Sequence, residues 1–202
     1  MTDAFSKKDF KAMRTPGLEE RMEAIQTEIQ PKFKSFGETL TSFLSLRLGT
    51  EMFLHIARHA RRSVNPPDST WFAIANDKRG YKKHPHFQVG LYGDYVFVWL
   101  AFIYENTDRT KIAERFLKNQ RIFLDMTGFS ISKDHMVPTT YPLEQEVLES
   151  ALTRFRDVKK GEFLVGKIYH ENDPILKSSD SFLVEVESVF DELLPLYLLS
   201  LK

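Results

Sequence analysis

The sequence predicts a single α+β domain over residues 1–202, with a mainly antiparallel sheet of about five or six strands covered by helices. Two observations lead to this prediction. Runs with the two-residue period of strands are concentrated between residues 52 and 104, and stripes with the helical period precede and follow them. No linker, internal repeat or low-complexity segment divides the chain.

The first part of the chain is expected to be helical. Apolar residues recur at spacings of three or four over residues 18–29, which places them on one face of an amphipathic helix. Pro31 lacks a backbone N–H, so it is expected to end this helix and to begin another. The second helix carries an apolar stripe over residues 33–48, and Gly49 is expected to end it.

Strands are expected to follow. They combine alternating apolar residues with aromatic and β-branched runs, and turn residues separate them. The expected strands cover residues 52–57, 71–75, 87–92 and 95–104. Gly93-Asp94 is short enough to join the last two as a hairpin.

In the second half, helices are expected to alternate with strands. The expected helices are one over residues 107–123 capped by Thr107 or Asp108, one over residues 142–155 with Pro142 near its start, and a last one capped by Ser179 or Asp180. A weak strand at residues 128–132 and a strand at residues 162–170 lie between them. Pro195 is expected to bend or shorten the last helix.

The composition excludes several classes of protein. With no cysteine among 202 residues, disulfide frameworks, zinc-thiolate sites, iron–sulfur clusters and cysteine nucleophiles are impossible. The N-terminus lacks the apolar segment of a signal peptide, and the longest apolar run is about half of the ~20 residues that a membrane-spanning helix needs. We therefore expect a cytoplasmic protein that does not interact with membranes.

The formal net charge of zero conceals two charged regions. Residues 55–92 contain seven Lys or Arg and two acidic residues, a net charge of +5, together with four histidines. Residues 171–192 contain seven acidic residues and one Lys, a net charge of −6. A balanced chain has no long-range field that would draw it to nucleic acid, but the basic region favours a local anion site.

Several unusual segments occur in a distinctive order and spacing. They are PGLEERM at 16–22, EMFLHIARHARRSVNPP at 51–67, KRGYK at 78–82, PHFQVG at 85–90, DHM at 134–136, VKKGE at 158–162 and LPLY at 194–197. In these segments the chain resembles the YktB-like family of uncharacterised bacterial proteins over essentially its whole length. The resemblance implies a compact α+β domain of bacterial type and transfers no activity, cofactor or catalytic residue.

The first candidate site is the basic segment that contains His55, Arg58, His59, Arg61 and Arg62. In a strand, His55, His59 and Arg61 would share one face, and in a helix the two histidines, four residues apart, would also meet. A pair of imidazoles can bind a transition metal, but Ile56 occupies the position of the glutamate in the zinc-protease motif. The alternative is a basic surface whose histidines hydrogen-bond to nearby carboxylates.

The second candidate is the loop at residues 78–86. Gly80 permits a turn or a close approach to a ligand, Arg79 offers a planar fork for phosphate, and Tyr81 offers a stacking face. Lys82 and His86 add two further polar groups. The loop lacks the glycine spacing of a phosphate-binding P-loop, and the alternative is an ordinary solvated loop.

The third candidate is the pair Asp134-His135, in which a carboxylate could orient an imidazole as a general base. Adjacent residues of an extended chain point to opposite faces, so the histidine would need a partner from elsewhere, such as Glu105 or Asp94. No Gly-x-Ser-x-Gly motif is present, which disfavours the common serine hydrolases.

These observations favour a binding domain with a cationic pocket for a phosphorylated small molecule or, with less support, for a nucleic-acid backbone. The expected ligand-binding residues are His55, Arg58, His59, Arg61, Arg62, Arg79, Tyr81, Lys82 and His86. We expect no bound metal or cofactor. The alternatives are a histidine-based hydrolase of phosphoesters or esters, with or without a metal, that uses His55, His59, His86 or His135, and a domain whose acidic C-terminal region meets the basic region of another copy.

Overall fold

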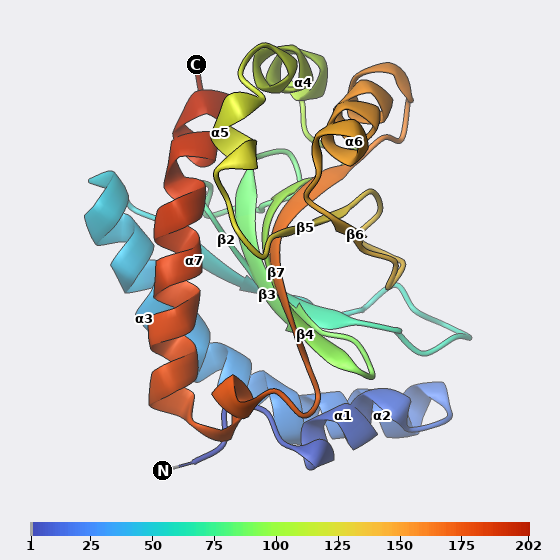
Figure 1. The fold of residues 1–202 in the computed structure, drawn as a ribbon. Coiled ribbons are helices and arrows are strands. Elements are labelled where there is room, and N and C mark those ends of the chain that lie inside the picture. The colour runs from blue at the N-terminus through green and yellow to red at the C-terminus, as the bar shows by residue number, and fades with distance from the viewer. Residues whose placement is uncertain (1) are drawn as a thin grey trace.

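A seven-stranded antiparallel sheet forms the centre of the protein in the computed structural model, which describes residues 2–202 (Figure 1). The strands are β1 (Phe53–Ile56), β2 (Thr70–Ala75), β3 (His86–Leu91), β4 (Tyr95–Phe102), β5 (Ser130–Ser132), β6 (Tyr141–Pro142) and β7 (Phe163–His170). Their order across the sheet is β1-β2-β3-β4-β7-β5-β6. The α+β class is confirmed, and the expected five or six strands were too few because β6 spans only two residues and contains a proline.

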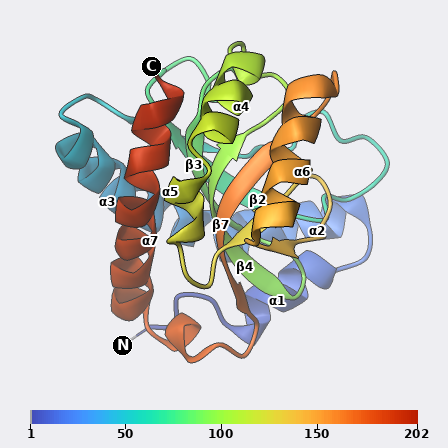
Figure 2. The ribbon, with the colours of Figure 1, turned by 45° about the horizontal axis from the view of Figure 1, so that its top comes forward.

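Helices cover one face of the sheet, which we call the first face. They are α1 (Lys7–Arg14), α2 (Leu18–Ala24), a π-helical segment (Ile25–Ile29), α3 (Gln30–Leu48), α4 (Arg109–Lys118), α5 (Arg121–Leu124), α6 (Gln145–Asp157), a 3-10 turn (Pro174–Lys177) and α7 (Ser179–Ser200). Figures 1 and 2 show α3 and α7 side by side along this face, with α4 and α6 at one end of the sheet and α1 and α2 at the other.

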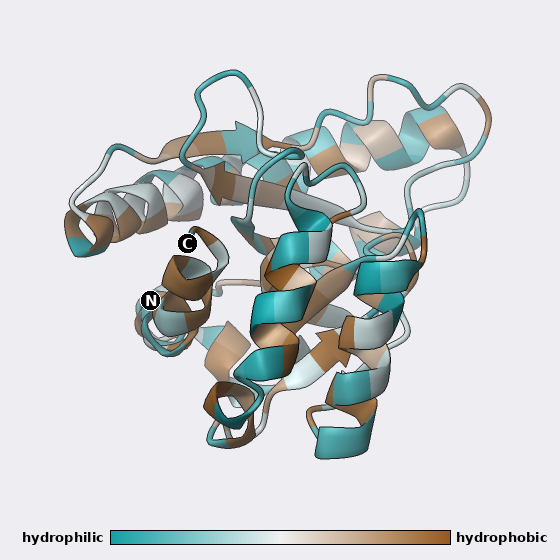
Figure 3. Ribbon diagram, turned by 90° about the horizontal axis from the view of Figure 1, so that it is seen from above, coloured by the Kyte–Doolittle hydropathy of each residue, from teal (hydrophilic) through white to brown (hydrophobic). Residues whose placement is uncertain are grey.

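The main core lies between the first face and these helices. Alternate residues of the strands are fully buried there, and aromatic rings from the helices pack on them. Phe33 of α3 contacts Phe72 of β2 at 5.4 Å between ring centroids, and Phe190 of α7 contacts Phe87 of β3 at 4.8 Å. Figure 3 shows brown and teal segments alternating along the helices, as amphipathic helices require.

Two prolines behave differently from the sequence prediction. Pro31 does not separate two helices, because α2 continues through the π-helical segment into α3. The π-helical turns, which are wider than α-helical ones, end at Ile29, just before the proline. Pro195 does not shorten α7, which runs on to Ser200 because Leu196 and Tyr197 in its last turn are buried against the core. Gly49 ends α3 as predicted, with a left-handed φ of 63°.

Other helix ends differ by a few residues. The single helix expected over residues 107–123 is interrupted at Asn119, which divides it into α4 and α5. Asp108 takes the N-cap position of α4 as expected, whereas Ser178, one residue earlier than expected, caps α7. Helix α1 was not predicted, although Ser6 and Asp9 form a reciprocal capping box at its start.

The other face of the sheet, which we call the second face, carries no helical residue in its hydrophobic cluster. The strand register places one row of side chains across it, from His55 through Ala73, Gln88, Trp99 and Gly166 to Ser130. Gly166 leaves room in this row for the indole of Trp99, because a Cβ at Gly166 would lie 2.9 Å from Cε3 of that ring. Within residues 2–202, no helix combines the length and apolar character that a bilayer span requires.

Candidate functional site

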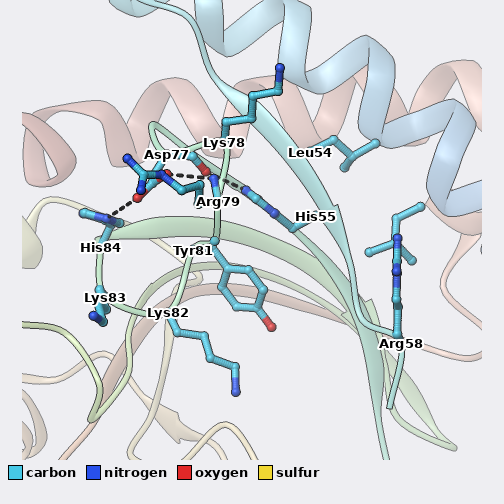
Figure 4. Close-up of a pocket in the computed structure, with 12 residues that line it drawn as sticks. Leu54, His55, Arg58, Asp77, Lys78, Arg79, Tyr81, Lys82, Lys83 and His84 are labelled. Carbon is cyan, nitrogen blue, oxygen red and sulfur yellow. Dashed lines mark hydrogen bonds and ion pairs between the residues drawn. The ribbon is translucent and has the colours of Figure 1, made fainter. Parts of the chain in front are cut away.

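A pocket of about 790 Å³ opens where the end of β1 meets the loop that follows β2 (Figure 4). Two segments some twenty residues apart in the sequence therefore line one cavity. The lining residues are Leu54, His55, Ile56 and Arg58 from the first segment and Asp77, Lys78, Arg79, Gly80, Tyr81, Lys82, Lys83 and His84 from the second.

Five of the nine expected ligand-binding residues line this pocket, namely His55, Arg58, Arg79, Tyr81 and Lys82. The other four do not. Arg61 and Arg62 lie beyond the pocket in the loop after β1, and His59 and His86 contribute to the sheet side of the site instead. The convergence of the two basic segments was expected, but it involves a shorter part of the first segment than the sequence suggested.

Asp77 organises the loop of the pocket. Its Oδ1 accepts a hydrogen bond of 2.7 Å from the backbone N–H of Arg79, its Oδ2 accepts one of 3.1 Å from His84 Nε2, and its carbonyl accepts one of 2.9 Å from His55 Nε2. The bond from Arg79, helped by His84, lowers the pKa of the Asp77 carboxyl despite partial desolvation. Asp77 thus holds the loop together through its carboxylate and ties the loop to β1 through its backbone carbonyl, which leaves Nδ1 of His55 as an acceptor.

The cationic side chains of the pocket extend in different directions. In Figure 4, Lys78 and Lys82 leave the loop on opposite sides, and Arg58 lies across the pocket from Arg79. Lys82 approaches Glu105 at 3.6 Å, whereas Arg58, Lys78, Arg79 and Lys83 form no ion pair within residues 2–202. These unpaired cations face solvent, so an anion would have to draw them together.

His59 does not share a strand face with His55, because β1 ends at Ile56 and the backbone of His59 is left-handed, with a φ of 50°. His59 is the non-glycine residue with a positive φ in the described chain, which indicates a locally strained turn. Its Nε2 lies 3.1 Å from the hydroxyl of Thr70, and its ring packs edge-on against Trp71. Burial, with a smaller effect from the charge of Arg62, lowers the pKa of His59 to about 4.

His86 is completely buried beneath the pocket, where its ring lies 4.8 Å from that of Tyr81. Its Nδ1 is 2.8 Å from the carbonyl of His84, so Nδ1 carries the proton and donates it. Nε2 then accepts from the amide of Gln88 at 2.9 Å, which leaves Gln88 Oε1 as a free acceptor. Burial lowers the pKa of His86 to about 3, so this imidazole is neutral and supports the loop.

The imidazoles and aromatic rings of the second face form two groups of ring contacts, which the hydrogen bond from Trp71 to Tyr81 joins into one cluster. Its members are His55, His59, Trp71, Tyr81, His86 and His135, and we call it the imidazole–aromatic cluster. Trp71 lies at its centre, with ring contacts of 5.6 Å to His59 and 5.7 Å to His135. Tyr81 belongs to both the cluster and the pocket, so it forms the wall between them.

At the far side of the cluster, His135 pairs with Glu162, the residue just before β7. Glu162 Oε2 accepts 2.7 Å from His135 Nδ1 and 2.8 Å from the backbone N–H of His135, and Oε1 accepts 3.3 Å from the N–H of Tyr104. Burial opposes the charge of Glu162, but these hydrogen bonds outweigh it and hold the pKa of the carboxyl below its ordinary value. Glu162 is therefore a buried carboxylate that fixes the ring of His135.

The neighbouring carboxylate of Asp134 completes a group of three potential metal ligands. One atom each from Asp134, His135 and Glu162 lies within 4.8 Å of the others. All three side chains already form hydrogen bonds, because His135 Nδ1 donates to Glu162 and Asp134 Oδ1 accepts from the N–H of Met136. A cation at Nδ1 would have to displace the proton that this atom donates to Glu162, so the arrangement favours a hydrogen-bonded pair over a metal centre.

His135 was expected from the sequence to need a carboxylate partner, but that partner is Glu162 and not Glu105 or Asp94. The partner comes from the start of β7, and only the strand order β4-β7-β5 brings this point beside residue 135. A signal was present, because DHM at 134–136 and VKKGE at 158–162 are both among the segments that carry the family resemblance.

The fold and the site define an α+β protein with an antiparallel sheet, helices on one face, and a pocket beside an imidazole–aromatic cluster on the other. The chain belongs to the family described as DUF1054, a domain of unknown function, which matches residues 5–197. A UPF0637 protein of Listeria monocytogenes is 62% identical over 199 residues, covering 98% of both chains. A UPF0637 protein of Oceanobacillus iheyensis is 50% identical over 200 residues, covering 98% of this chain and 97% of the relative. The resemblance to a family of uncharacterised bacterial proteins is thereby confirmed.

Proposed function

We propose that this protein binds a phosphorylated small molecule in the pocket between β1 and the loop that follows β2. The observation that carries the proposal is the joint lining of one cavity by Arg58 from the first basic segment and Arg79 from the second. Guanidinium groups form paired hydrogen bonds to phosphate oxygens, and neither of these two forms an ion pair within residues 2–202. The phenol ring of Tyr81 offers a flat surface for a base or a sugar.

A small molecule fits this site better than a nucleic-acid strand does. The volume of about 790 Å³ lies within the range of ligand pockets. A backbone-binding surface would instead need cations spread along a track, and Arg61 and Arg62 do not extend the pocket in that way. A pool of phosphorylated metabolites also agrees with the cytoplasmic location expected from the sequence.

Calorimetry and thermal unfolding of the full chain test the proposal with inorganic phosphate, a sugar phosphate and a nucleoside monophosphate as probes. At 100 times its Kd, a ligand stabilises the folded state by about 2.7 kcal/mol. We expect Arg58→Ala and Arg79→Ala each to weaken the binding of the best probe at least tenfold. Arg61→Ala is the matched control, since it removes the same charge from the same segment outside the pocket, and it is expected to change the affinity less than twofold. Failure of every probe, or an equal loss in Arg61→Ala, would contradict the proposal.

Salt dependence distinguishes a small ligand from a nucleic acid. If the protein neutralised about five phosphates of a duplex, its affinity for the duplex would fall about 500-fold between 50 and 200 mM salt. We expect a much smaller change for the small phosphorylated probe. Tight duplex binding with this steep salt dependence would show that the pocket binds a nucleic-acid backbone and not a small molecule.

The metal-assisted alternative centred on His55 and His59 has less support. His55 bonds to the carbonyl of Asp77 and His59 to Thr70, and their rings contact different aromatic residues. Within residues 2–202, the group of potential metal ligands includes neither histidine. Elemental analysis of the purified protein tests this alternative, which requires a stoichiometric transition metal that is lost in His55→Ala and His59→Ala.

A further inference from the structure

We propose that the ligand of the pocket is the phosphate ester of a polyol, such as a sugar or cyclitol phosphate, and that Nδ1 of His55 accepts a hydrogen bond from one of its hydroxyl groups. This inference rests on the proposed function, because it assumes that Arg58 and Arg79 hold the phosphate. It is argued from the polar atoms of the pocket wall that lack a partner, from the charge of the lining, and from the rings that already pack against Tyr81.

The hydrogen bond of His55 determines which of its ring nitrogens is available to a ligand. Nε2 lies 2.9 Å from the carbonyl oxygen of Asp77. A carbonyl oxygen only accepts, so Nε2 carries the proton of the neutral imidazole and Nδ1 keeps a lone pair. Within residues 2–202, no group donates a hydrogen bond to Nδ1. His55 is half-buried and lines the pocket, and in Figure 4 its ring extends from β1 toward Asp77, above the ring of Tyr81.

Tyr81 supplies a donor on the same wall of the pocket. Its ring centroid is 5.6 Å from that of His55. The hydroxyl oxygen accepts from Nε1 of Trp71 at 3.1 Å, and the hydroxyl proton has no acceptor among the described residues. Two neighbouring side chains thus offer one acceptor and one donor to the cavity. A polyol complements them, because its hydroxyl groups can donate to the first and accept from the second.

The charges of the lining disfavour an amino group on the ligand. Five of the lining residues are Lys or Arg, and the one acidic residue is Asp77. Both carboxylate oxygens of Asp77 already accept hydrogen bonds within the loop. A cationic group would therefore be repelled by like charges. A neutral hydroxyl needs no counter-charge, so the part of the ligand beyond the phosphate is expected to be uncharged.

The rings around Tyr81 disfavour a nucleobase. The phenol ring is contacted by His86 at 4.8 Å and by His55 at 5.6 Å between centroids. His86 is completely buried and bonds to the carbonyl of His84, so it is fixed beneath the phenol. A planar base would compete with these imidazoles for the face of the phenol. Hydroxyl groups need only the polar atoms of the wall, which favours a polyol phosphate over a nucleotide.

Binding of matched esters is the first test. myo-Inositol 1-phosphate and cyclohexyl phosphate share a six-membered carbon ring and a phosphate, and they differ in the ring hydroxyls. In calorimetry of the full chain at pH 8, we expect the inositol ester to bind about tenfold or more tightly than the cyclohexyl ester, as two hydrogen bonds allow, and more tightly than adenosine monophosphate. Equal affinities of the two esters, or tighter binding of the nucleotide, would overturn the inference and leave phosphate binding intact.

His55→Gln is the second test, because it retains an N–H toward the carbonyl of Asp77 and removes the acceptor Nδ1. We expect the affinity for the inositol ester to fall about fivefold or more. The affinities for cyclohexyl phosphate and inorganic phosphate should change less than twofold, which also shows that the pocket is still folded. His170→Gln makes the same substitution at an exposed histidine outside the pocket and is the matched control. An unchanged affinity for the inositol ester in His55→Gln, or an equal loss for all three ligands, would contradict the role of His55.

Nitrogen-15 NMR of the wild-type imidazoles, with His55→Gln to assign the signals, reports the tautomer of His55. We expect a protonated Nε2 and an unprotonated Nδ1 whose signal moves when the inositol ester binds and not when cyclohexyl phosphate binds. A protonated Nδ1 would overturn the inference. Failure of the proposed function would differ from all these outcomes, because neither ester nor inorganic phosphate would bind, or their binding would not depend on Arg58 and Arg79.

Discussion

The indole Nε1 of Trp71 donates a hydrogen bond of 3.1 Å to the hydroxyl of Tyr81. Trp71 belongs to β2 and Tyr81 to the loop that follows it, so this bond attaches the pocket loop to the second face. Burial raises the pKa of Tyr81, which keeps its hydroxyl protonated and able to donate to a ligand while it accepts from Trp71. The side chain of Tyr81 therefore links the pocket to the imidazole–aromatic cluster.

Tyr81→Phe tests this connection. The variant leaves the buried N–H of Trp71 without an acceptor, and an unsatisfied buried donor costs about 1–3 kcal/mol. We expect a loss of that size in the free energy of unfolding measured with urea. Tyr141→Phe removes the hydroxyl of an exposed tyrosine and is the control, with an expected change within about 0.5 kcal/mol. Equal effects of the two variants would show that the Trp71–Tyr81 bond contributes nothing.

Gly90→Ala is expected to disturb the second face. A Cβ at Gly90 would lie 2.3 Å from the carbonyl oxygen of Thr70 and 2.6 Å from the Cβ of Trp71, and the backbone of a central strand cannot move away cheaply. We expect a loss of about 1–3 kcal/mol in urea unfolding, the usual cost of overpacking.

Gly80→Ala is the matched control for that variant. Nothing lies within 4 Å of a Cβ at Gly80, and its φ is not in the left-handed region, so the turn role expected from the sequence is not needed. The substitution should leave stability unchanged or raise it by about 0.4–1 kcal/mol through the unfolded state. A marked loss in Gly80→Ala would contradict this account of the loop.

Acid should destabilise the protein through its buried histidines. The pKa of His86 is lowered to about 3 and that of His59 to about 4, below the value near 6.5 in the unfolded chain. Their contribution is fully present above pH 6.5 and is lost as the pH falls toward 4, because the unfolded chain then binds protons that the folded chain excludes. Each histidine contributes a slope of up to about 1.4 kcal/mol per pH unit.

Urea unfolding at several pH values between 7.5 and 4.5 measures this slope. His86→Asn retains a donor toward the carbonyl of His84 but cannot gain a proton, so we expect a shallower slope than in wild type. His170→Asn removes an exposed imidazole and is expected to leave the slope unchanged. Parallel slopes for wild type and His86→Asn would refute a role of His86 in acid sensitivity.

The sequence predicted well where a feature depends on local pattern. The hairpin of β3 and β4 follows from two apolar runs around Gly93-Asp94, and the left-handed end of α3 follows from Gly49. The convergence of His55 with the loop around Arg79 was also expected, because the two flank consecutive strands.

Features that depend on strand order could not be predicted. Glu162 reaches His135 only because β7 inserts between β4 and β5, and no local pattern encodes that insertion. The separation of His59 from His55 depends on where β1 stops and on one left-handed residue, and alternation within the segment does not show either.

The last prediction concerns the two tyrosines that hold the loop at residues 133–138. Tyr92 and Tyr95 lie at the turn of the β3–β4 hairpin and donate to two carbonyls of this loop. In the double variant Tyr92→Phe and Tyr95→Phe both rings still pack, but each hydroxyl is lost at a cost of about 0.5–1.5 kcal/mol. Since Glu162 still holds the backbone N–H of His135 from the other side, the loop should loosen without the sheet opening.

Hydrogen exchange followed by mass spectrometry can separate these two outcomes. We expect faster exchange over residues 133–138 and unchanged exchange in β3, β4 and β7, because the strand ladders do not involve the tyrosine hydroxyls. Tyr104→Phe, which removes an exposed hydroxyl beyond the end of β4, controls for the loss of a phenol alone. Faster exchange throughout the sheet would mean that the two tyrosine hydroxyls stabilise the whole fold. It would contradict the prediction that their hydrogen bonds act on the loop at residues 133–138 alone.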